Sequence, residues 1–222
     1  MPLQLLPLDE SDMDVNTNIM FASFGPDLMT IMYPNGWTQA DIDHSVKESK
    51  AMRKKHTDDV VYTKVIDTDL PADGPTKQII GTAKWQIYAK ERSEADLEAE
   101  KKEHAESEPG PSADTKMLES FFGAISKART ETMGGRPYVL LSILATHPDH
   151  HRRGVGAMQL KHGLAMVDEL GLPAFLEASP KGKPLYERFG FEPVGLLDFD
   201  EKKFGAKVNL QHVLMLRPAQ KK

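Results

Sequence analysis

The stretch that decides the fold covers residues 140–157 and reads LLSILATHPDHHRRGVGA. Its first part is apolar and β-prone and ends at Pro148, and Arg152 and Arg153 then precede Gly154-Val155-Gly156 and a helical pattern. We therefore expect a strand, a tight turn and a helix. The first turn of a helix has unpaired N–H groups and the positive end of the helix dipole, so it is a ready site for a phosphate or pyrophosphate.

Small and basic residues at this turn strengthen the anion-binding interpretation. Gly154 and Gly156 would let a ligand approach the main chain closely, and Arg152 and Arg153 would add positive charge. Taken alone, a Gly-x-Gly at a strand-to-helix turn is equally typical of a plain turn.

Composition narrows the class of protein. The chain has 222 residues, with 40% hydrophobic and 27% charged residues, as in an ordinary globular protein. The absence of cysteine excludes disulfides, thiolate metal sites and a cysteine acyl-enzyme. No apolar run approaches the roughly 20 residues that span a bilayer, and the N-terminus does not read as a signal peptide. We expect a cytoplasmic protein, with the nucleus as an alternative, and no membrane partner.

Charge is unevenly distributed along the chain. The net charge is −5, and most of the acidic excess lies between residues 89 and 117. The rest is nearly neutral, which gives no indication of a nucleic-acid-binding surface.

Periodicity and turn residues predict the other elements in chain order. In the N-terminal half they are a strand at Leu3–Leu8, a helix ending at Phe24, a helix from Thr38 to about His56, a hairpin of Val60–Asp67 with Gln78–Tyr88, a solvated helix and flexible loop over 89–115, and a helix containing Met117–Ile125. In the C-terminal half they are a strand at Tyr138–Thr146, a helix from about Arg153 to Leu170, a strand at Pro173–Ser179, a short helix at Pro184–Gly190, and strands at Phe191–Phe199 and Val208–Leu216.

The span Tyr138–Val194 resembles the acetyl-CoA core of the GNAT acyltransferase superfamily. That family's pattern of Gln or Arg, two residues, Gly, one residue, and Gly or Ala falls on HRRGVG at residues 151–156, with His151 in the place of the usual Gln or Arg. Ser179 and LYERFGF at residues 185–191 match the downstream pattern at the expected separation.

The resemblance implies an α/β (α+β) protein with the GNAT fold, in which a mixed, mostly antiparallel central sheet of six to seven strands splays between strands 4 and 5 and is flanked by helices. It implies a single domain over residues 1–222, with a charged helical insertion at about 89–135 between strands 3 and 4.

The same resemblance implies acetyl-CoA as cosubstrate. Strand 4 would hold the pantetheine and thioester, residues 152–157 would hold the pyrophosphate, and Ser179 would face the cofactor chain. Arg188 would reach a phosphate or lie in solvent. The implied cofactor-binding set is Leu144, Ala145, Thr146, His151, Arg152, Arg153, Gly154, Val155, Gly156, Ala157, Ser179 and Arg188.

The implied catalytic residue is Tyr186, which resembles the family's general acid and would protonate the departing thiolate. The alternative is a packing tyrosine on a short helix. The base stays open: a water chain, with Ser142 or Glu177 as a relay, would take the proton of the attacking ammonium. With no cysteine nucleophile, we expect direct attack in a ternary complex. His147, His150 and His151 lack a regular ligand spacing, so no metal site is expected.

The acceptor would lie across the splayed sheet, next to the first two helices. Residues rich in Met and aromatic side chains are candidates to line its pocket, although core packing explains them as well: Phe24, Met29, Met32, Tyr33 and Trp37. We expect the Met117–Ile125 helix to cover part of this opening. The predicted function is N-acetylation of a primary amine of a small molecule or peptide by a monomer or homodimer, and the alternative is a catalytically weak acyl-CoA-binding module.

Overall fold

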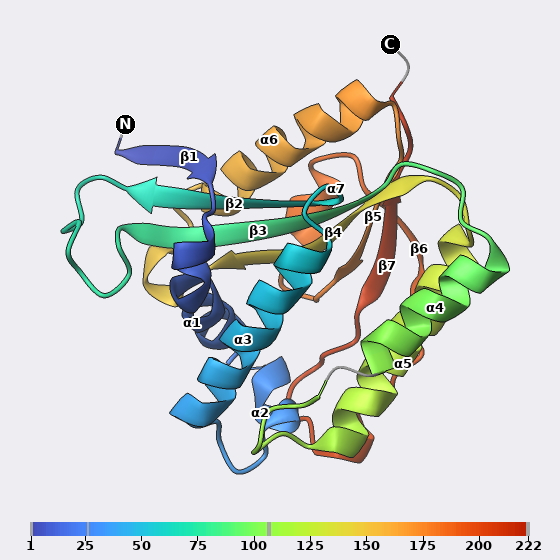
Figure 1. Ribbon diagram of the computed structural model, residues 1–222, viewed down its shortest axis with the longest axis horizontal. Coiled ribbons are helices and arrows are strands. Elements are labelled where there is room, and N and C mark those ends of the chain that lie inside the picture. Colours follow the sequence, from blue (N-terminus) through green and yellow to red (C-terminus); the bar gives the residue numbers. More distant parts are fainter. Residues whose placement is uncertain (1, 26, 106–107, 221–222) are drawn as a thin grey trace.

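The structure is a computed structural model that describes residues 2–25, 27–105 and 108–220 (Figure 1). In those residues a seven-stranded sheet has the order β1-β2-β3-β4-β5-β7-β6, and β4 and β5 are its parallel pair while the other neighbours are antiparallel. The mixed, mostly antiparallel sheet is thus confirmed. Its strands are β1 (Leu3–Pro7), β2 (Val60–Asp67), β3 (Ile79–Tyr88), β4 (Tyr138–Thr146), β5 (Ala174–Ala178), β6 (Glu192–Leu196) and β7 (Val213–Arg217).

Helices cover both faces of the sheet. The α-helices are α1 (Met13–Phe24), α2 (Leu28–Met32), α3 (Gln39–Lys55), α4 (Glu94–Ala105), α5 (Thr115–Met133), α6 (Val155–Leu170) and α7 (Lys183–Glu187), and the 3-10 helices are η1 (Glu10–Asp12), η2 (Pro148–His150) and η3 (Glu201–Phe204). Helix α6 packs on one face, whereas α1, α2 and α5 pack on the other. None of the helices described here has both the length and the apolar character that crossing a bilayer requires.

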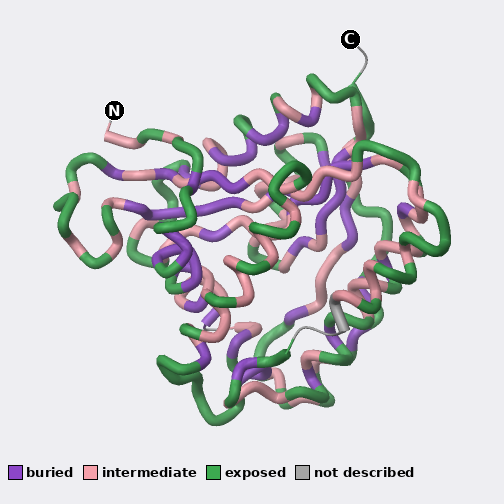
Figure 2. Tube along the Cα trace, viewed as in Figure 1, coloured by how far each residue is buried: buried purple, intermediate pink, exposed green. Residues whose placement is uncertain are grey.

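Alternating strand residues build the two main core clusters, and Figure 2 shows buried segments running along the central strands. Trp85 on β3 belongs to the α6 cluster and is 1% exposed. A register shift in the β2–β3 pair places Ile79 in the α1 cluster, on the other face from Ala83 and Trp85. The alternation in sequence of Ile79, Ala83, Trp85 and Ile87 predicts one shared face, but a bulge at the start of the strand reverses the side-chain direction and places Ile79 on the other face.

The sheet opens between β4 and β5. These strands pair only at Val139 with Ala174 and at Leu140 with Phe175. On the other side of β4, the register with β3 passes from Leu141 directly to Ile143, so Ser142 is an extra residue at a bulge. The predicted splay between strands 4 and 5 is confirmed, and it leaves the second half of β4 unpaired on its β5 side.

Two predicted strands are shorter than expected. β6 ends at Leu196 and β7 begins at Val213, and the residues between them form η3 and loops. The reason is packing: Phe199 stacks on Phe204, and Leu197 and Leu210 join the cluster around α5. The chain there turns inward to bury apolar side chains instead of extending the edge of the sheet.

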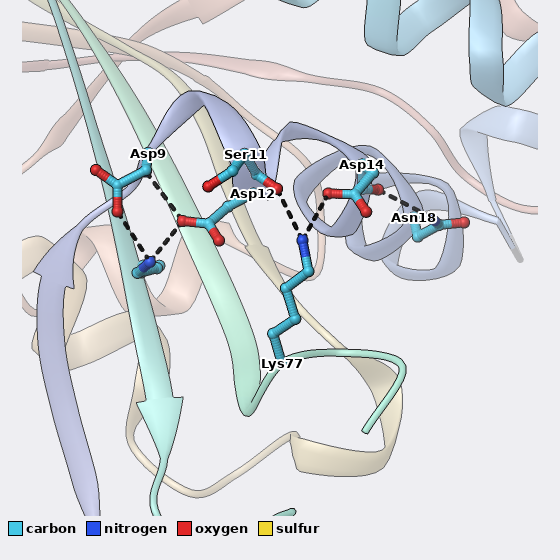
Figure 3. A network of polar contacts seen from close by, with 7 residues as sticks. Asp9, Ser11, Asp12, Asp14, Asn18 and Lys77 are labelled. Atoms are coloured by element: carbon cyan, nitrogen blue, oxygen red, sulfur yellow. Dashed lines mark hydrogen bonds and ion pairs between the residues drawn. The ribbon is translucent and has the colours of Figure 1, made fainter. Parts of the chain in front are cut away.

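Polar contacts fix the start of α1 on the sheet edge (Figure 3). Lys77, in the β2–β3 turn, donates from Nζ to the Ser11 carbonyl at 2.8 Å and pairs with the Asp14 carboxylate at 3.4 Å. The Asp9 N–H donates to Asp12 Oδ2 at 3.0 Å. Because α1 runs from this anchor toward the middle of the molecule, its last turn reaches the cavity described below.

The connection between β3 and β4 contains α4 and α5. Helix α4 is largely exposed, as the charge run predicts, whereas α5 buries Met117, Phe121, Ala128 and Met133 in the main cluster. Glu103 of α4 contacts Lys55 at 2.7 Å and His56 at 3.0 Å, both at the end of α3. Further along, the Ser112 N–H donates to Asp41 Oδ1 at 2.8 Å and the Asp114 N–H donates to the Met32 carbonyl at 2.8 Å. The connection therefore closes over α2 and α3, although residues 106 and 107 of its predicted loop lie outside the described part.

Candidate active site

The turn between β4 and α6 exposes main-chain N–H groups. Arg152 has φ of 63° and Gly154 has φ of 85°, so the chain passes twice through the left-handed region before the helix starts. The N–H of Met158 donates to the Gly154 carbonyl at 2.9 Å. The N–H groups of residues 155–157 precede this bond and have no helical acceptor. The turn can therefore bind an anion through its backbone.

The two arginines of the turn differ in their partners. Arg153 pairs with Asp67 of β2 at 2.7 Å, and this hydrogen bond holds the pKa of the Asp67 carboxyl below its usual value. Arg152 is exposed and lines the cavity next to the turn. Of the two, Arg152 is the one whose charge is available to a ligand. The His151 ring donates from Nε2 to the Thr146 carbonyl at 3.0 Å, which ties the turn to the end of β4.

A single cavity of about 2340 Å³ joins this turn to the region between α2, α3 and α5. Ligand pockets for one small molecule are commonly about 300–1,000 Å³, so this cavity has room for two. At its β4–α6 end the predicted cofactor residues that line it are Leu144, Thr146, His151, Arg152, Gly154, Val155, Gly156, Ala157, Ser179 and Arg188. Arg153 is absent from the described lining residues, and the Ala145 side chain packs against Val15 and Ile19 of α1.

Tyr186 of α7 lies in the same cavity. Burial raises the pKa of its phenol, so the hydroxyl keeps its proton at neutral pH. Gly182 makes room for the ring, since a Cβ at that position would lie 2.9 Å from it. Next to it, Ser179 Oγ accepts a hydrogen bond from the Gly182 N–H at 3.2 Å. These contacts fix the loop that carries both side chains into the cavity.

Charged side chains form part of the cavity wall on the α5 side of the sheet. Arg129 of α5 donates from Nε to Glu177 Oε1 at 2.7 Å and from Nη2 to Oε2 at 3.0 Å. Burial alone would lower the pKa of the Arg129 guanidinium, but the pairing with Glu177 more than offsets it and raises that pKa. Glu177 is thus part of a two-pronged ion pair, and its role as a relay stays a prediction. Ser142, the other relay candidate, also lines the cavity.

Two further polar residues of this wall were missed by the sequence analysis. His212 donates from Nδ1 to the Leu210 carbonyl at 2.7 Å, and burial lowers the pKa of its imidazole, which favours the neutral ring with Nε2 as an acceptor. Lys84 of β3 is the second. In the sequence, Thr82, Lys84 and Gln86 alternate with apolar residues over the predicted strand Gln78–Tyr88, and this pattern is a usable signal for Lys84, whereas His212 follows an irregular segment that gives none.

The apolar walls agree in part with the predicted acceptor pocket. Phe24, Met29, Met32 and Tyr33 line the cavity, and α5 adds Leu118, Phe121, Phe122 and Ile125. Trp37 does not belong to the described lining residues: its ring packs edge-on against Phe21 at 5.8 Å, and 38% of the residue is exposed. Trp37 thus lies next to a lining residue, Phe21, and its place in the acceptor pocket stays a prediction.

Histidines and carboxylates are not grouped for metal binding in the parts of the chain that the structure describes. In residues 2–25, 27–105 and 108–220, no cluster of three or more His, Asp or Glu side chains could hold a metal ion.

No model of a known protein family matches the chain. Solved structures are similar to it over nearly its whole length. Mosquito arylalkylamine N-acetyltransferase like 5b has a TM-score of 0.65 at 17% identity, covering 97% of this chain and 99% of its own. A Corynebacterium glutamicum protein described as histone acetyltransferase HPA2 and related acetyltransferase has a TM-score of 0.62 at 19% identity. The match covers 100% of this chain and 99% of that protein's chain. A Desulfovibrio desulfuricans protein that is described as an acetyltransferase of the GNAT family has a TM-score of 0.52 at 12% identity. The match covers 98% of this chain and 99% of that protein's chain. At these identities the likeness establishes the fold, and the chain has the GNAT fold.

Proposed function

We propose that this chain is an acetyl-CoA-dependent N-acetyltransferase that moves an acetyl group to a primary amine by direct attack in a ternary complex. The observation that carries the proposal is the combination of the separated β4 and β5 strands with the unpaired N–H groups at the start of α6, in one cavity. The similarity to acetyltransferase folds agrees with it, but a fold alone does not define an activity.

Each part of the cosubstrate has a chemically matching part of the chain. The pyrophosphate would accept hydrogen bonds from the backbone of residues 155–157, with Arg152 adding charge. The pantetheine arm carries amide groups, and these would pair with the backbone of β4 after Leu140, where β5 no longer does. A backbone N–H in the Leu144–Thr146 segment would polarise the thioester carbonyl.

The transfer needs one proton donor and one proton acceptor. The amine nitrogen attacks the thioester carbon, the C–N bond forms as the C–S bond breaks, and Tyr186 gives its proton to the departing thiolate. A phenol whose pKa is raised by burial is present in the protonated form that this step requires. The proton of the amine would leave through cavity water, with Ser142 or Glu177 as a relay.

The test combines calorimetry with a thiol-release assay on a panel of primary amines. We expect heat on titration with CoA and release of thiol that depends on the amine. Tyr186→Phe should lower kcat by about 10²–10⁴-fold, the range for loss of a general acid, and leave the Kd for CoA unchanged. Tyr62→Phe is the matched control because Tyr62 is buried on β2 and outside the described cavity lining.

Each alternative gives a different result. CoA binding without thiol release from any amine would support the acyl-CoA-binding module. The absence of heat with CoA would overturn both the acetyltransferase function and the acyl-CoA-binding function. Parallel double-reciprocal lines would contradict the ternary complex, because they indicate a covalent acyl-enzyme.

A further inference from the structure

Among the residues that the structure describes, Lys84 has no carboxylate partner, whereas Arg129 in the same wall is paired with Glu177. Its side chain lines the cavity, and its described neighbours include the ring of Tyr62, whose centroid lies 5.7 Å from Nζ. No carboxylate of the described residues lies within 4.0 Å of this ammonium group. Burial, and then the positive charge of Arg129, lower the pKa of Lys84.

Two neighbouring cations differ from Lys84 because each has carboxylate partners. Lys64, on β2, also points toward the helices on that side of the sheet, and it pairs with Asp12 and Asp9. Arg129 is balanced by Glu177 through two hydrogen bonds. The wall formed by Arg129, Glu177 and Lys84 therefore keeps one uncompensated positive charge. A buried charge without a partner is costly, so this place favours a ligand that brings a negative charge.

The position of Lys84 in the sheet brings it near the reacting end of the cavity. Lys84 pairs in register with Ile143 on β4, next to the bulge at Ser142. The second half of β4 is the segment proposed above to hold the thioester. A lysine on the adjacent strand can therefore reach a group of the acceptor a few bonds away from the attacking nitrogen.

We propose that Lys84 binds a carboxylate of the acceptor, so the preferred acceptors are small amino acids, which carry a primary amine and a carboxylate in one molecule. This inference rests on the proposed acetyltransferase function and specifies its substrate class. The ammonium donates charge-assisted hydrogen bonds to the carboxylate and thereby gains the negative partner that the described residues do not supply.

The experiment compares matched acceptors in which a neutral amide replaces the carboxylate, and the acid-to-amide ratio of each variant is compared with that of the wild type. β-Alanine is compared with β-alaninamide, and phenylalanine with phenylalaninamide, in thiol-release assays on the full chain. The wild type should have the higher kcat/KM for the acid of each pair. Lys84→Met should reduce the acid-to-amide ratio by about 10- to 100-fold, as expected for loss of a charge-assisted hydrogen bond. The change should lie in KM, and Lys84→Arg should restore part of the ratio.

Two controls separate specificity from folding and from general catalysis. Lys161→Met removes an exposed lysine of α6 outside the described cavity lining and should leave the ratio unchanged. Thermal melts show whether Lys84→Met is folded, and Lys84→Gln provides a polar variant if it is not. An unchanged ratio would overturn the proposal. An equal loss of kcat for acid and amide would also overturn it, because it would identify Lys84 as a general base instead.

A binding measurement keeps this inference separate from the proposed function. N-acetyl-β-alanine and N-acetyl-β-alaninamide are titrated into the CoA-saturated chain by calorimetry. Tighter binding of the acid in the wild type, lost in Lys84→Met, supports the carboxylate site even if no amine is acetylated. Equal binding of the two compounds contradicts it, whatever the turnover.

Discussion

Two helical glycines have opposite surroundings, and they predict opposite effects of the same substitution. Gly163 of α6 faces β3, and a Cβ there would lie 2.2 Å from Trp85 Cε2, 2.3 Å from Cζ2 and 2.5 Å from Nε1. Gly123 of α5 is exposed, and a Cβ there would have no heavy atom within 4 Å apart from its chain neighbours and the backbone of its own helix. We predict that Gly163→Ala destabilises the chain and that Gly123→Ala stabilises it.

The magnitudes follow from these distances. Ordinary contacts of a Cβ begin at 3.4 Å, so α6 or the indole must move by about 1 Å, and Trp85 is 1% exposed with little room to do so. Overpacking a core costs about 1–3 kcal/mol, and a clash with a rigid ring belongs at the upper end. Alanine regains about 0.5–1 kcal/mol over glycine inside a helix. Gly163→Ala should thus lose about 2 kcal/mol, and Gly123→Ala should gain about 0.5–1 kcal/mol.

Urea unfolding, followed by far-UV circular dichroism, measures both free energies. In a thermal scan, the loss at Gly163 corresponds to a Tm roughly 4–8 °C lower for a domain of this size. Gly156 lies two helical turns before Gly163, so a displaced α6 should also raise the Kd for CoA in Gly163→Ala alone. Wild-type stability in Gly163→Ala would refute the packing of α6 against Trp85. Equal destabilisation by both substitutions would show that the loss comes from elsewhere.

Two further predictions concern the charged wall of the cavity. Glu177→Gln removes the charge opposite Arg129 and should lower the free energy of unfolding by about 3 kcal/mol, because a largely buried cation is left without its partner; a loss of a few tenths of a kcal/mol in urea unfolding would contradict this. Burial lowers the pKa of His212 from its ordinary value of 6.5, so as the pH falls through that value the unfolded chain binds the proton first and the folded state loses stability. His212→Gln should lose less stability than the wild type between pH 7 and pH 5. Urea midpoints that fall equally in both proteins would show that His212 does not cause the loss.

Local sequence signals were sufficient for most of the fold. The strand Tyr138–Thr146 was predicted with the bounds that the structure has, because its apolar run ends just before His147 and Pro148. Glycines marked the helix ends: Gly134 follows α5 with φ of 56°, and Gly171 follows α6 with φ of 67°. The splay was not a local signal, and it came from the family resemblance. The ends of strands and helices depend on residues that are neighbours in sequence, and for this reason they can be predicted without coordinates.

The polar part of the cavity could not be predicted in the same way. Arg129 and Glu177 are 48 residues apart and meet only because α5 packs across β5. The sequence contains no spacing that couples them or that adds Lys84 and His212 to the same wall. The Met and aromatic residues of the first helices indicated an apolar acceptor, and they do form apolar walls, but the charges opposite them come from other segments.

The passage between the β4–α6 turn and the gap beside β4 is narrow, and this explains why a glycine is needed at the start of α6. The same passage limits the kind of ligand that fits there. A Cβ on Gly156 would lie 3.0 Å from Leu185 Cδ2 of α7 and 3.9 Å from Leu144 Cδ2 of β4, so three elements meet at this residue. Any side chain there would narrow the passage between the turn and the gap beside β4. The backbone along that gap needs hydrogen-bond partners once β5 has separated. A ligand that satisfies both ends must therefore be narrow, carry amide groups along its length and finish in an anion, and these are the chemical features of a phosphopantetheine arm.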